Sequence, residues 1–361
     1  MTLVENKAIP ILIDIMEKSQ HIEVKEQAIW CIGNISGDNT RLRDTILEQN
    51  ACAIISDLVD QAPAGSSFTR NASWTLANFC KGRPMANFDR LKRSISSLTK
   101  VMAENDSEEI LTDITWAFSY ASDEGGDERI KIFLDCNAVP RLIQLLNHPN
   151  ITIAVPCLRT LGNILTGSDD LAQRAIECGV LEEFSKLLDH PKRAVRKEVC
   201  WSISNVTAGN PQQIQKCIDI GLIERLIAHL HQDTMDIKKE AVWAVSNATS
   251  QATPQQFAYF VQTGILQAIG AVLDAPDPKT LTVSMEGIAY VLKAGQSQLD
   301  EDGENPYALA AERCGLMEKI EALQFNENQK VYEKAVSLLE EYFALEDNND
   351  IVGMLQNQPT Q

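Results

Sequence analysis

A tryptophan followed four residues later by an asparagine recurs along the chain. The pairs are Trp30 with Asn34, Trp74 with Asn78, Trp201 with Asn205, and Trp243 with Asn247. An asparagine side chain both donates and accepts hydrogen bonds, so a row of them can bind the backbone of an extended peptide whatever its sequence. Aromatic rings between the amides form slots that suit a long aliphatic stem ending in a cation.

Carboxylates accompany these pairs. Glu198 and Glu240 each precede a tryptophan by three residues, about one helical turn. Further acidic residues lie close in sequence to the same positions, namely Asp38, Asp113, Asp123 and Asp169. Such groups would pair with the charged heads of bound lysines and arginines. The pattern therefore predicts a site for an extended, Lys/Arg-rich segment.

The pairs belong to one register, which we call the ladder. Three further pairs hold the same two positions: Trp116 with Tyr120, Arg159 with Asn163, and Glu286 with Tyr290. By subtraction, successive first members are 42 to 44 residues apart, and all five tryptophans fall on the register. A period of about 40–47 residues made of helical patterns is typical of an armadillo or HEAT solenoid. The sequence thus predicts an all-α solenoid.

One tryptophan at helical spacing is usually a core residue. Five in one register, most with an amide or a tyrosine four residues later, are harder to explain by packing, because a buried amide costs free energy unless it is hydrogen-bonded. The pattern favours a binding surface. We expect the helices that carry it to line the inner surface of the solenoid, since aromatic and amide side chains do not suit a fully solvated face.

Helix starts recur in a second register between the ladder positions, at Lys7-Ala-Ile-Pro10, Asn137-Ala-Val-Pro140, Gly179, Gly221 and Gly264. Each repeat therefore holds at least two long helices besides its ladder helix. Gly37 is expected to end the first ladder helix, and residues 87–128 to follow the common plan. Gln296 to Pro306 is an inserted loop, and residues 346–361 are a polar, acidic tail.

Composition narrows the function further. Fifty acidic against 32 basic residues give a net charge of -18, so nucleic acid is not an expected partner.

The sequence shows no membrane span and no secretory signal. The nine cysteines lack Cys-x-x-Cys spacing and are read as reduced packing residues. The five histidines suggest no metal site, and no phosphate loop or nucleophile elbow is present, so neither an enzyme nor a cofactor is expected.

Several segments carry a family resemblance. They are Trp-x-x-Gly-Asn-Ile-Ser-Gly-Asp at Trp30, Trp-Thr-Leu-Ala-Asn at Trp74, Trp-Ala-Phe-Ser-Tyr at Trp116, Arg-Thr-Leu-Gly-Asn-Ile-Leu-Thr-Gly at Arg159, Trp-Ser-Ile-Ser-Asn at Trp201, and Cys-Gly-Leu-Met-Glu-Lys-Ile-Glu-Ala-Leu-Gln from Cys314. From about Asn6 to Phe343 the chain resembles importin alpha, the nuclear-import adaptor family. The resemblance implies a right-handed armadillo superhelix over residues 1–345, of about seven to eight repeats with the first incomplete.

The resemblance also implies two sites for nuclear localisation signals on a concave groove. Carried over by position, the major site uses Trp30, Asn34, Asp38, Asn71, Trp74, Asn78, Glu109, Asp113 and Trp116. The minor site uses Asn163, Thr166, Asp169, Glu198, Trp201, Ser204, Asn205, Glu240, Trp243 and Asn247, with Tyr120 on its flank and Arg159 dividing the groove.

Partners follow from the same resemblance: cargo proteins, importin beta, a nuclear export receptor and nucleoporins, in a protein that shuttles between cytoplasm and nucleus. The family's basic N-terminal segment, which binds importin beta, and its first repeats have no counterpart in this sequence. We therefore do not expect these residues to bind importin beta.

Two other functions stay open. An armadillo adaptor of the adhesion and signalling kind would receive acidic partners, and its groove would carry a row of lysine, arginine and histidine where this chain has tryptophan, asparagine and carboxylates. An armadillo scaffold that does not bind localisation signals is the second alternative. Titration with a basic peptide separates it from the adaptor reading.

Overall fold

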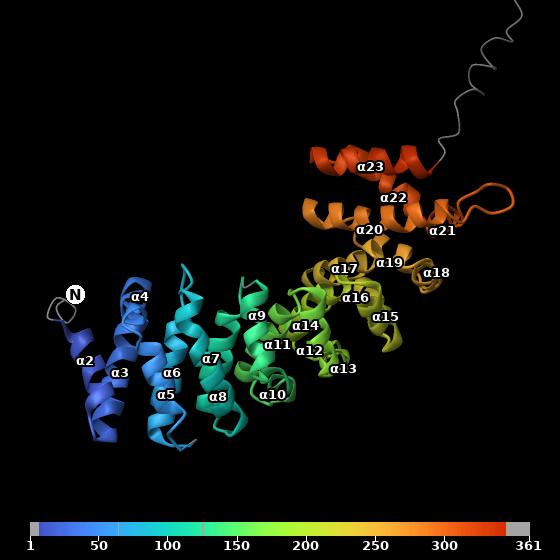
Figure 1. Cartoon of the computed structure of the whole chain (residues 1–361). Helices are drawn as coiled ribbons and strands as arrows, with labels where there is room; N and C mark the ends of the chain where they lie inside the picture. Colours follow the sequence, from blue (N-terminus) through green and yellow to red (C-terminus); the bar gives the residue numbers. More distant parts are fainter. Residues whose placement is uncertain (1–6, 64, 125, 344–361) are drawn as a thin grey trace, which may run out of the picture. The chain divides into compact units, whose positions relative to one another are not determined.

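Every regular element in the described part of the chain is a helix. The structure, a computed structural model, describes residues 7–63, 65–124 and 126–343. The chain divides between Leu187 and Leu188 into two compact units, which we call the N-terminal and the C-terminal unit (Figure 1). The predicted tail, 346–361, lies outside the described residues.

In the N-terminal unit, the ladder residues lie on four helices that pack one against the next. These ladder helices are α3 (Ile22–Asp38), α6 (Ser67–Cys80), α8 (Glu108–Ala121) and α11 (Ile151–Ile164). A second row pairs with them or continues along them and consists of α2 (Ala8–Lys18), α5 (Ala51–Val59), α7 (Phe88–Ala103), α10 (Ala138–Leu145) and α13 (Val180–Leu187). Short connecting helices are α4 (Thr40–Glu48), α9 (Asp127–Asp135) and α12 (Asp169–Glu177).

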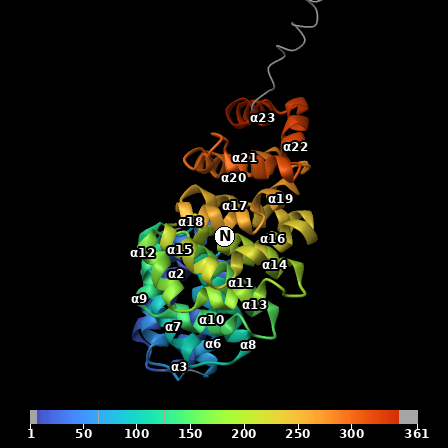
Figure 2. The same cartoon turned by 90° about the vertical axis from the view of Figure 1, so that its right-hand side faces the viewer.

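The C-terminal unit repeats this plan. Its ladder-row helices, packed in succession, are α14 (Arg193–Thr207), α17 (Met235–Ser250), α20 (Pro278–Gln296) and α23 (Gln329–Tyr342). In Figure 2, a second row lies along one side of them, made of α16 (Leu222–Gln232), α19 (Ile265–Gly270) and α22 (Leu316–Ala322), which continues into the 3-10 helix η1 (Leu323–Phe325). The connecting helices are α15 (Pro211–Asp219), α18 (Pro254–Gln262) and α21 (Pro306–Arg313).

The predicted helix starts of the second register are confirmed, and they share one backbone feature. Each is preceded by a residue with positive φ, namely Lys7 (58°), Asn137 (62°), Gly179 (88°), Gly221 (72°) and Gly264 (85°). Glycine adopts this left-handed conformation without strain, and asparagine tolerates it better than most residues. The residue turns the chain sharply, so that a connecting helix is followed directly by a second-row helix.

Two details of the predicted plan are wrong. Gly37 does not end the first ladder helix, which continues through Asp38. The helix stops there because the next residue, Asn39, is in extended conformation and serves as the N-cap of α4. Residues 87–128 do not hold separate connecting and second-row helices before the ladder helix. The single helix α7 takes both places, since Phe88–Ala103 contains no glycine, asparagine or proline that would break it.

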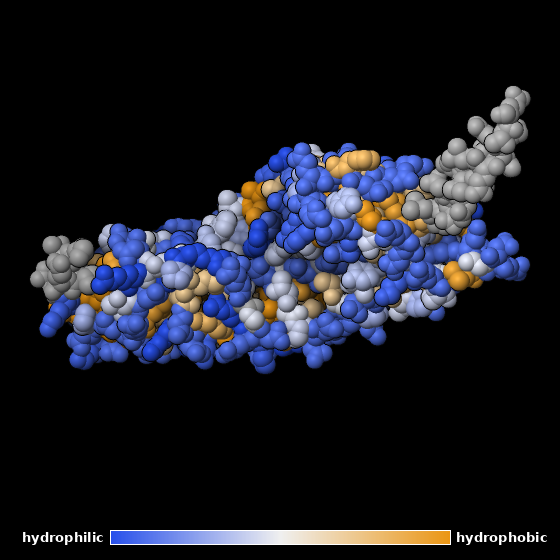
Figure 3. Space-filling view, turned by 90° about the horizontal axis from the view of Figure 1, so that it is seen from above, coloured by the Kyte–Doolittle hydropathy of each residue, from blue (hydrophilic) through white to orange (hydrophobic). Residues whose placement is uncertain are grey.

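The core lies between the rows. Ile29, Ile32 and Leu76 on the ladder helices are at most 1% exposed, as are Ile55 and Ile95 on the second row. Outside the core, most of the surface visible in Figure 3 is hydrophilic, in keeping with the net charge of -18. Among the described helices, none is both long enough and apolar enough to cross a membrane.

Candidate functional site

The tryptophans of the ladder are not core residues. In the N-terminal unit, Trp30 on α3 and Trp116 on α8 expose 49% and 36% of their surface, and Trp74 on α6 between them is half-buried. In the C-terminal unit, Trp201 on α14 and Trp243 on α17 are also half-buried. A ring that is partly open to solvent on consecutive, packed helices is available to a ligand, which a ring filling the core is not.

Gly33 provides the space for the Trp74 ring. A Cβ atom added to Gly33 would lie 2.4 Å from Cζ3 of Trp74 and 2.5 Å from Oγ1 of Thr75, distances that no folded protein tolerates without a shift of the neighbour. The indole of α6 therefore lies directly against the backbone of α3. The glycine of the Gly-Asn motif thus fixes the position of the next tryptophan, a role that the sequence analysis did not identify.

The ladder asparagines join neighbouring helices. The side-chain Nδ2 of Asn78 donates to the backbone oxygen of Gly33 at 3.3 Å, and Asn163 donates to Ser119 at 3.4 Å. In the C-terminal unit, Asn247 donates to Ser204 at 3.0 Å. Each acceptor lies on the preceding ladder helix. A side-chain amide has two N–H groups and one carbonyl, and in each of these asparagines one N–H is used between helices.

Asn34 differs from these asparagines. It is exposed, and its Nδ2 donates to the backbone oxygen of Trp30 in the same helix, at 2.9 Å. Tyr120 replaces the amide on α8, where its ring lies 5.7 Å from that of Trp116, tilted by 33°. Arg159 is exposed at the corresponding position of α11. The i, i+4 spacing predicted from the sequence therefore places the members of these pairs on a shared face of each helix.

Asp113 is the carboxylate of the candidate major site that the protein environment perturbs most. Its burial in α8 raises the pKa to about 6, helped by the nearby charge of Glu109 and opposed by that of Lys81. A carboxylate desolvated in this way gains more from a bound cation than an exposed one does. Asp113 is therefore placed to respond both to a ligand and to pH.

Other predicted major-site residues already have partners within the N-terminal unit. Lys81 Nζ donates to Oδ1 of Asn78 at 2.9 Å. Asn71 Nδ2 donates to Glu26 at 2.6 Å, and Arg70 lies 3.5 Å from a carboxylate oxygen of Glu109. Asp38 is exposed beside Asn39, whose amide donates to it at 2.7 Å. A ligand would compete with or add to these bonds.

The residues predicted for the minor site fall into both units. Asn163 is buried in α11, where its amide also donates to Oγ of Ser122 at 3.0 Å. Thr166 and Asp169 are exposed, and Asp169 is the first residue of α12. In the C-terminal unit, Asn205, Glu198 and Glu240 are half-buried on the helices that carry Trp201 and Trp243, and Ser204 is buried with its hydroxyl donating to the oxygen of Trp201 at 2.7 Å.

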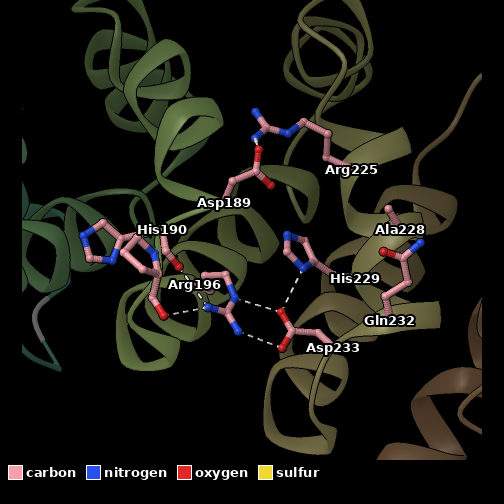
Figure 4. A pocket seen from close by; sticks show the side chains of 9 residues that line it. Asp189, His190, Arg196, Arg225, Ala228, His229, Gln232 and Asp233 are labelled. Atoms are coloured by element: carbon pink, nitrogen blue, oxygen red, sulfur yellow. Dashed lines mark hydrogen bonds and ion pairs between the residues drawn. The ribbon is translucent and has the colours of Figure 1, made fainter.

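A separate polar cavity of about 390 Å³ lies in the C-terminal unit, between the segment before α14 and the end of α16 (Figure 4). Its charges neutralise one another. Arg196 makes two hydrogen bonds to Asp233, at 2.8 and 2.9 Å, and also donates to the backbone oxygen of His190. His229 lies 3.0 Å from the same carboxylate, and Arg225 pairs with Asp189. These contacts connect two neighbouring repeats and indicate a structural role.

Metal binding and reaction at a cysteine thiol have little support in the described residues. No group of three or more histidine, cysteine, aspartate or glutamate side chains within them is arranged to hold a metal ion. Cys52, Cys80 and Cys217 are buried, and burial raises the pKa of their thiols to about 11, 12 and 12. Such thiols stay protonated near neutral pH and are poor nucleophiles.

Family models and solved structures define the class of protein. The armadillo/beta-catenin-like repeat matches residues 1–37, 126–166, 168–208 and 210–250, and an atypical Arm repeat matches 305–357. A designed armadillo repeat protein solved in complex with the peptide (KR)4 is 27% identical, with a TM-score of 0.61, over 68% of this chain and 98% of that one. The chain is an armadillo-repeat protein, and the predicted all-α solenoid is confirmed.

Curated relatives identify the family. Importin subunit alpha-1b of Oryza sativa subsp. japonica is 40% identical over 96% of this chain and 65% of its own length. Importin subunit alpha-4 of Arabidopsis thaliana is 40% identical over 95% of this chain and 72% of its own length. The chain belongs to the importin alpha family, which confirms the resemblance seen in the sequence. It spans about two thirds of the length of these relatives.

Proposed function

We propose that this chain is a nuclear import adaptor whose ladder binds Lys/Arg-rich nuclear localisation signals in extended conformation. The observation that carries the proposal is the repetition of a partly open tryptophan and an amide on consecutive, packed ladder helices with carboxylates beside them. Arginine and lysine have aliphatic stems that pack on aromatic rings and cationic heads that seek carboxylates. No other common peptide side chain satisfies both.

The amides give the backbone part of recognition. Asn78 is held by its bond to Gly33 and by the bond that its carbonyl accepts from Lys81, and Asn247 is held by its bond to Ser204. Both amides therefore have fixed directions before a peptide arrives. Pre-orientation lowers the entropy lost on binding. Because the amides contact backbone groups, they accept any sequence, and the tryptophans and carboxylates then select for cations.

The candidate major site lies in the N-terminal unit, with Trp30, Trp74 and Trp116 as the aromatic members and Asp38, Glu109 and Asp113 as the acidic ones. The candidate minor site uses Trp201 and Trp243 with Glu198 and Glu240 in the C-terminal unit, and Asn163, Thr166 and Asp169 in the N-terminal unit. Support comes from the designed relative that was solved in complex with (KR)4.

Cellular partners follow from membership of the importin alpha family. Cargo proteins bearing basic signals are the ligands, and the protein passes between cytoplasm and nucleus. Importin beta, a nuclear export receptor and nucleoporins are its transport partners in this proposal. We assign none of these three to a surface of the described residues.

A titration with labelled peptides tests the proposal. A fluorescent peptide with two Lys/Arg clusters should bind the protein, whereas a peptide in which glutamate replaces each lysine and arginine should not. Affinity should fall as salt rises, although stem–ring contacts persist at high salt. If neither peptide binds, the chain is a scaffold without localisation-signal recognition. Selective binding of the acidic peptide would place it among the other armadillo adaptors.

A further inference from the structure

A lysine of the chain itself lies on the Trp243 ring. The Nζ atom of Lys279 is 5.1 Å from the ring centroid, within the range of a cation–π interaction. Trp243 belongs to α17 and Lys279 to the first turn of α20, the next helix in the ladder row. The contact therefore has the geometry that a bound lysine or arginine would adopt in this slot.

The start of α20 holds Lys279 in place. Asp277 caps the helix by accepting hydrogen bonds from the backbone N–H of Thr280 at 3.1 Å and from its hydroxyl at 2.6 Å. Pro278 follows at the first helical position, and Thr280 is 1% exposed. With the cap and its two neighbours fixed, the backbone of Lys279 has one conformation, and its exposed side chain reaches across to α17.

Two further lysines lie near carboxylates of α17 and of the N-cap of α20. Lys197 on α14 lies 3.8 Å from Glu240, one helical turn before Trp243, and Lys239 lies 3.8 Å from Asp277. The described part of the N-terminal unit differs, since no cation within it lies over the exposed ring of Trp30. Lys279 is thus a cation that the chain itself places on the Trp243 ring.

We infer that Lys279 competes with a peptide lysine or arginine for the Trp243 ring, because the face that Lys279 covers can be reached only by displacing it. This inference rests on the proposed function. The stem–ring contact that a peptide gains at Trp243 replaces one that the chain loses, so the net gain is small. The slot consequently contributes less to the binding of a basic peptide than Trp243 and Asn247 would contribute without the lysine.

A pair of charge-removing variants tests the inference. Lys279→Ala removes the cation and the stem that cover the ring, whereas the control Lys293→Ala removes an exposed lysine from the same helix, about 21 Å away along its axis. At physiological salt, where the Debye length is about 8 Å, only Lys279→Ala should raise the affinity for a two-cluster basic peptide. We expect a gain of about two- to fivefold, the value of an exposed cation–π contact. Equal affinity of the wild type and both variants overturns the inference.

A second readout is independent of peptide affinity. Lysines dimethylated with ¹³C-formaldehyde keep their charge, and the methyl signal of Lys279, assigned by its loss in Lys279→Ala, should be shifted upfield by the indole ring current. The shift should vanish in Trp243→Leu and on saturation of the wild type with basic peptide. An unshifted signal, or one that saturating peptide leaves in place, contradicts the inference. If no basic peptide binds the wild type, the proposed function fails first, and an upfield signal would then report a packing contact only.

Discussion

The side-chain amide of Asn78 on α6 donates to the backbone oxygen of Gly33 on α3 at 3.3 Å. A residue that we propose to bind a peptide therefore also joins two repeats. The same double duty applies to Asn247, whose amide donates to Ser204. Under the proposed function, a substitution at either asparagine should change both peptide affinity and the free energy of unfolding, so both must be measured.

Asn78 and Asn34 separate the two roles. Asn78→Ala should lower the free energy of unfolding by about 1–3 kcal/mol, the net value of its two hydrogen bonds, to Gly33 and from Lys81. The loss should not be larger, because the oxygen of Gly33 still accepts from Ser36 Oγ at 3.0 Å. Asn34→Ala removes only an exposed bond within one helix and should leave stability almost unchanged. Urea unfolding measures the difference, and both variants should weaken peptide binding. Equal stability of the two would show that the bond between helices contributes nothing.

Gly33→Ala should disturb the Trp74 slot from beneath. The new methyl group would lie 2.4 Å from the indole, so the ring must shift, at a cost of about 1–3 kcal/mol typical of overpacking. Gly264→Ala, also a glycine-to-alanine change, is strained for a different reason, its φ of 85°, and lies in the second row. The affinity of the N-terminal unit for a basic peptide should drop in Gly33→Ala and not in Gly264→Ala. Calorimetry on both variants provides the comparison.

The fold was largely predictable from the sequence, because helix starts and ladder positions depend on local signals. Gly221 and Gly264 have positive φ directly after the ends of α15 and α18, as is usual for a glycine that ends a helix, and the next helix begins at the following residue. The contacts that hold the ladder together were not predictable. The Gly33–Trp74 approach and the Lys279–Trp243 contact join residues 41 and 36 positions apart by subtraction, and depend on how adjacent repeats stack. The single helix α7 was missed because a repeat template was imposed on a segment without a helix breaker.

Asp113 should make peptide binding depend on pH. Burial raises its pKa from 3.8 to about 6 in the folded protein, so its favourable contribution to folding, complete below 3.8, is lost as pH rises through 6. A bound cation favours the ionised form, and affinity should therefore fall as pH decreases through about 6. Asp113→Asn should remove this dependence, weaken binding at neutral pH, and stabilise the free protein there. Anisotropy titrations and thermal unfolding at pH 5 and 7.5 check the two signs.

The Arg196–Asp233 pair should stabilise the C-terminal unit over a defined pH range. The hydrogen bonds from Arg196 lower the pKa of Asp233 from 3.8 to about 2, so the stabilisation is present above 3.8 and lost as pH falls through 2. Arg196→Met should cost about 1.5–3 kcal/mol at neutral pH, as expected for hydrogen bonds to a charged group. Arg193→Met, which breaks the more exposed pair with Asp236 at 3.1 Å, should cost less than about 1 kcal/mol. Urea unfolding should show the Arg196→Met deficit shrinking towards pH 2.

The central claim is that the ladder tryptophans bind a basic peptide, and calorimetry of Trp74→Ala and Trp201→Ala with a two-cluster Lys/Arg peptide tests it most directly. Each variant should keep its helical circular dichroism, since neither ring fills the core. Loss of one ring removes a cation–π contact and stem packing, together about 1–3 kcal/mol, so each dissociation constant should rise by about five- to 150-fold. Unchanged affinity in both folded variants would contradict the account.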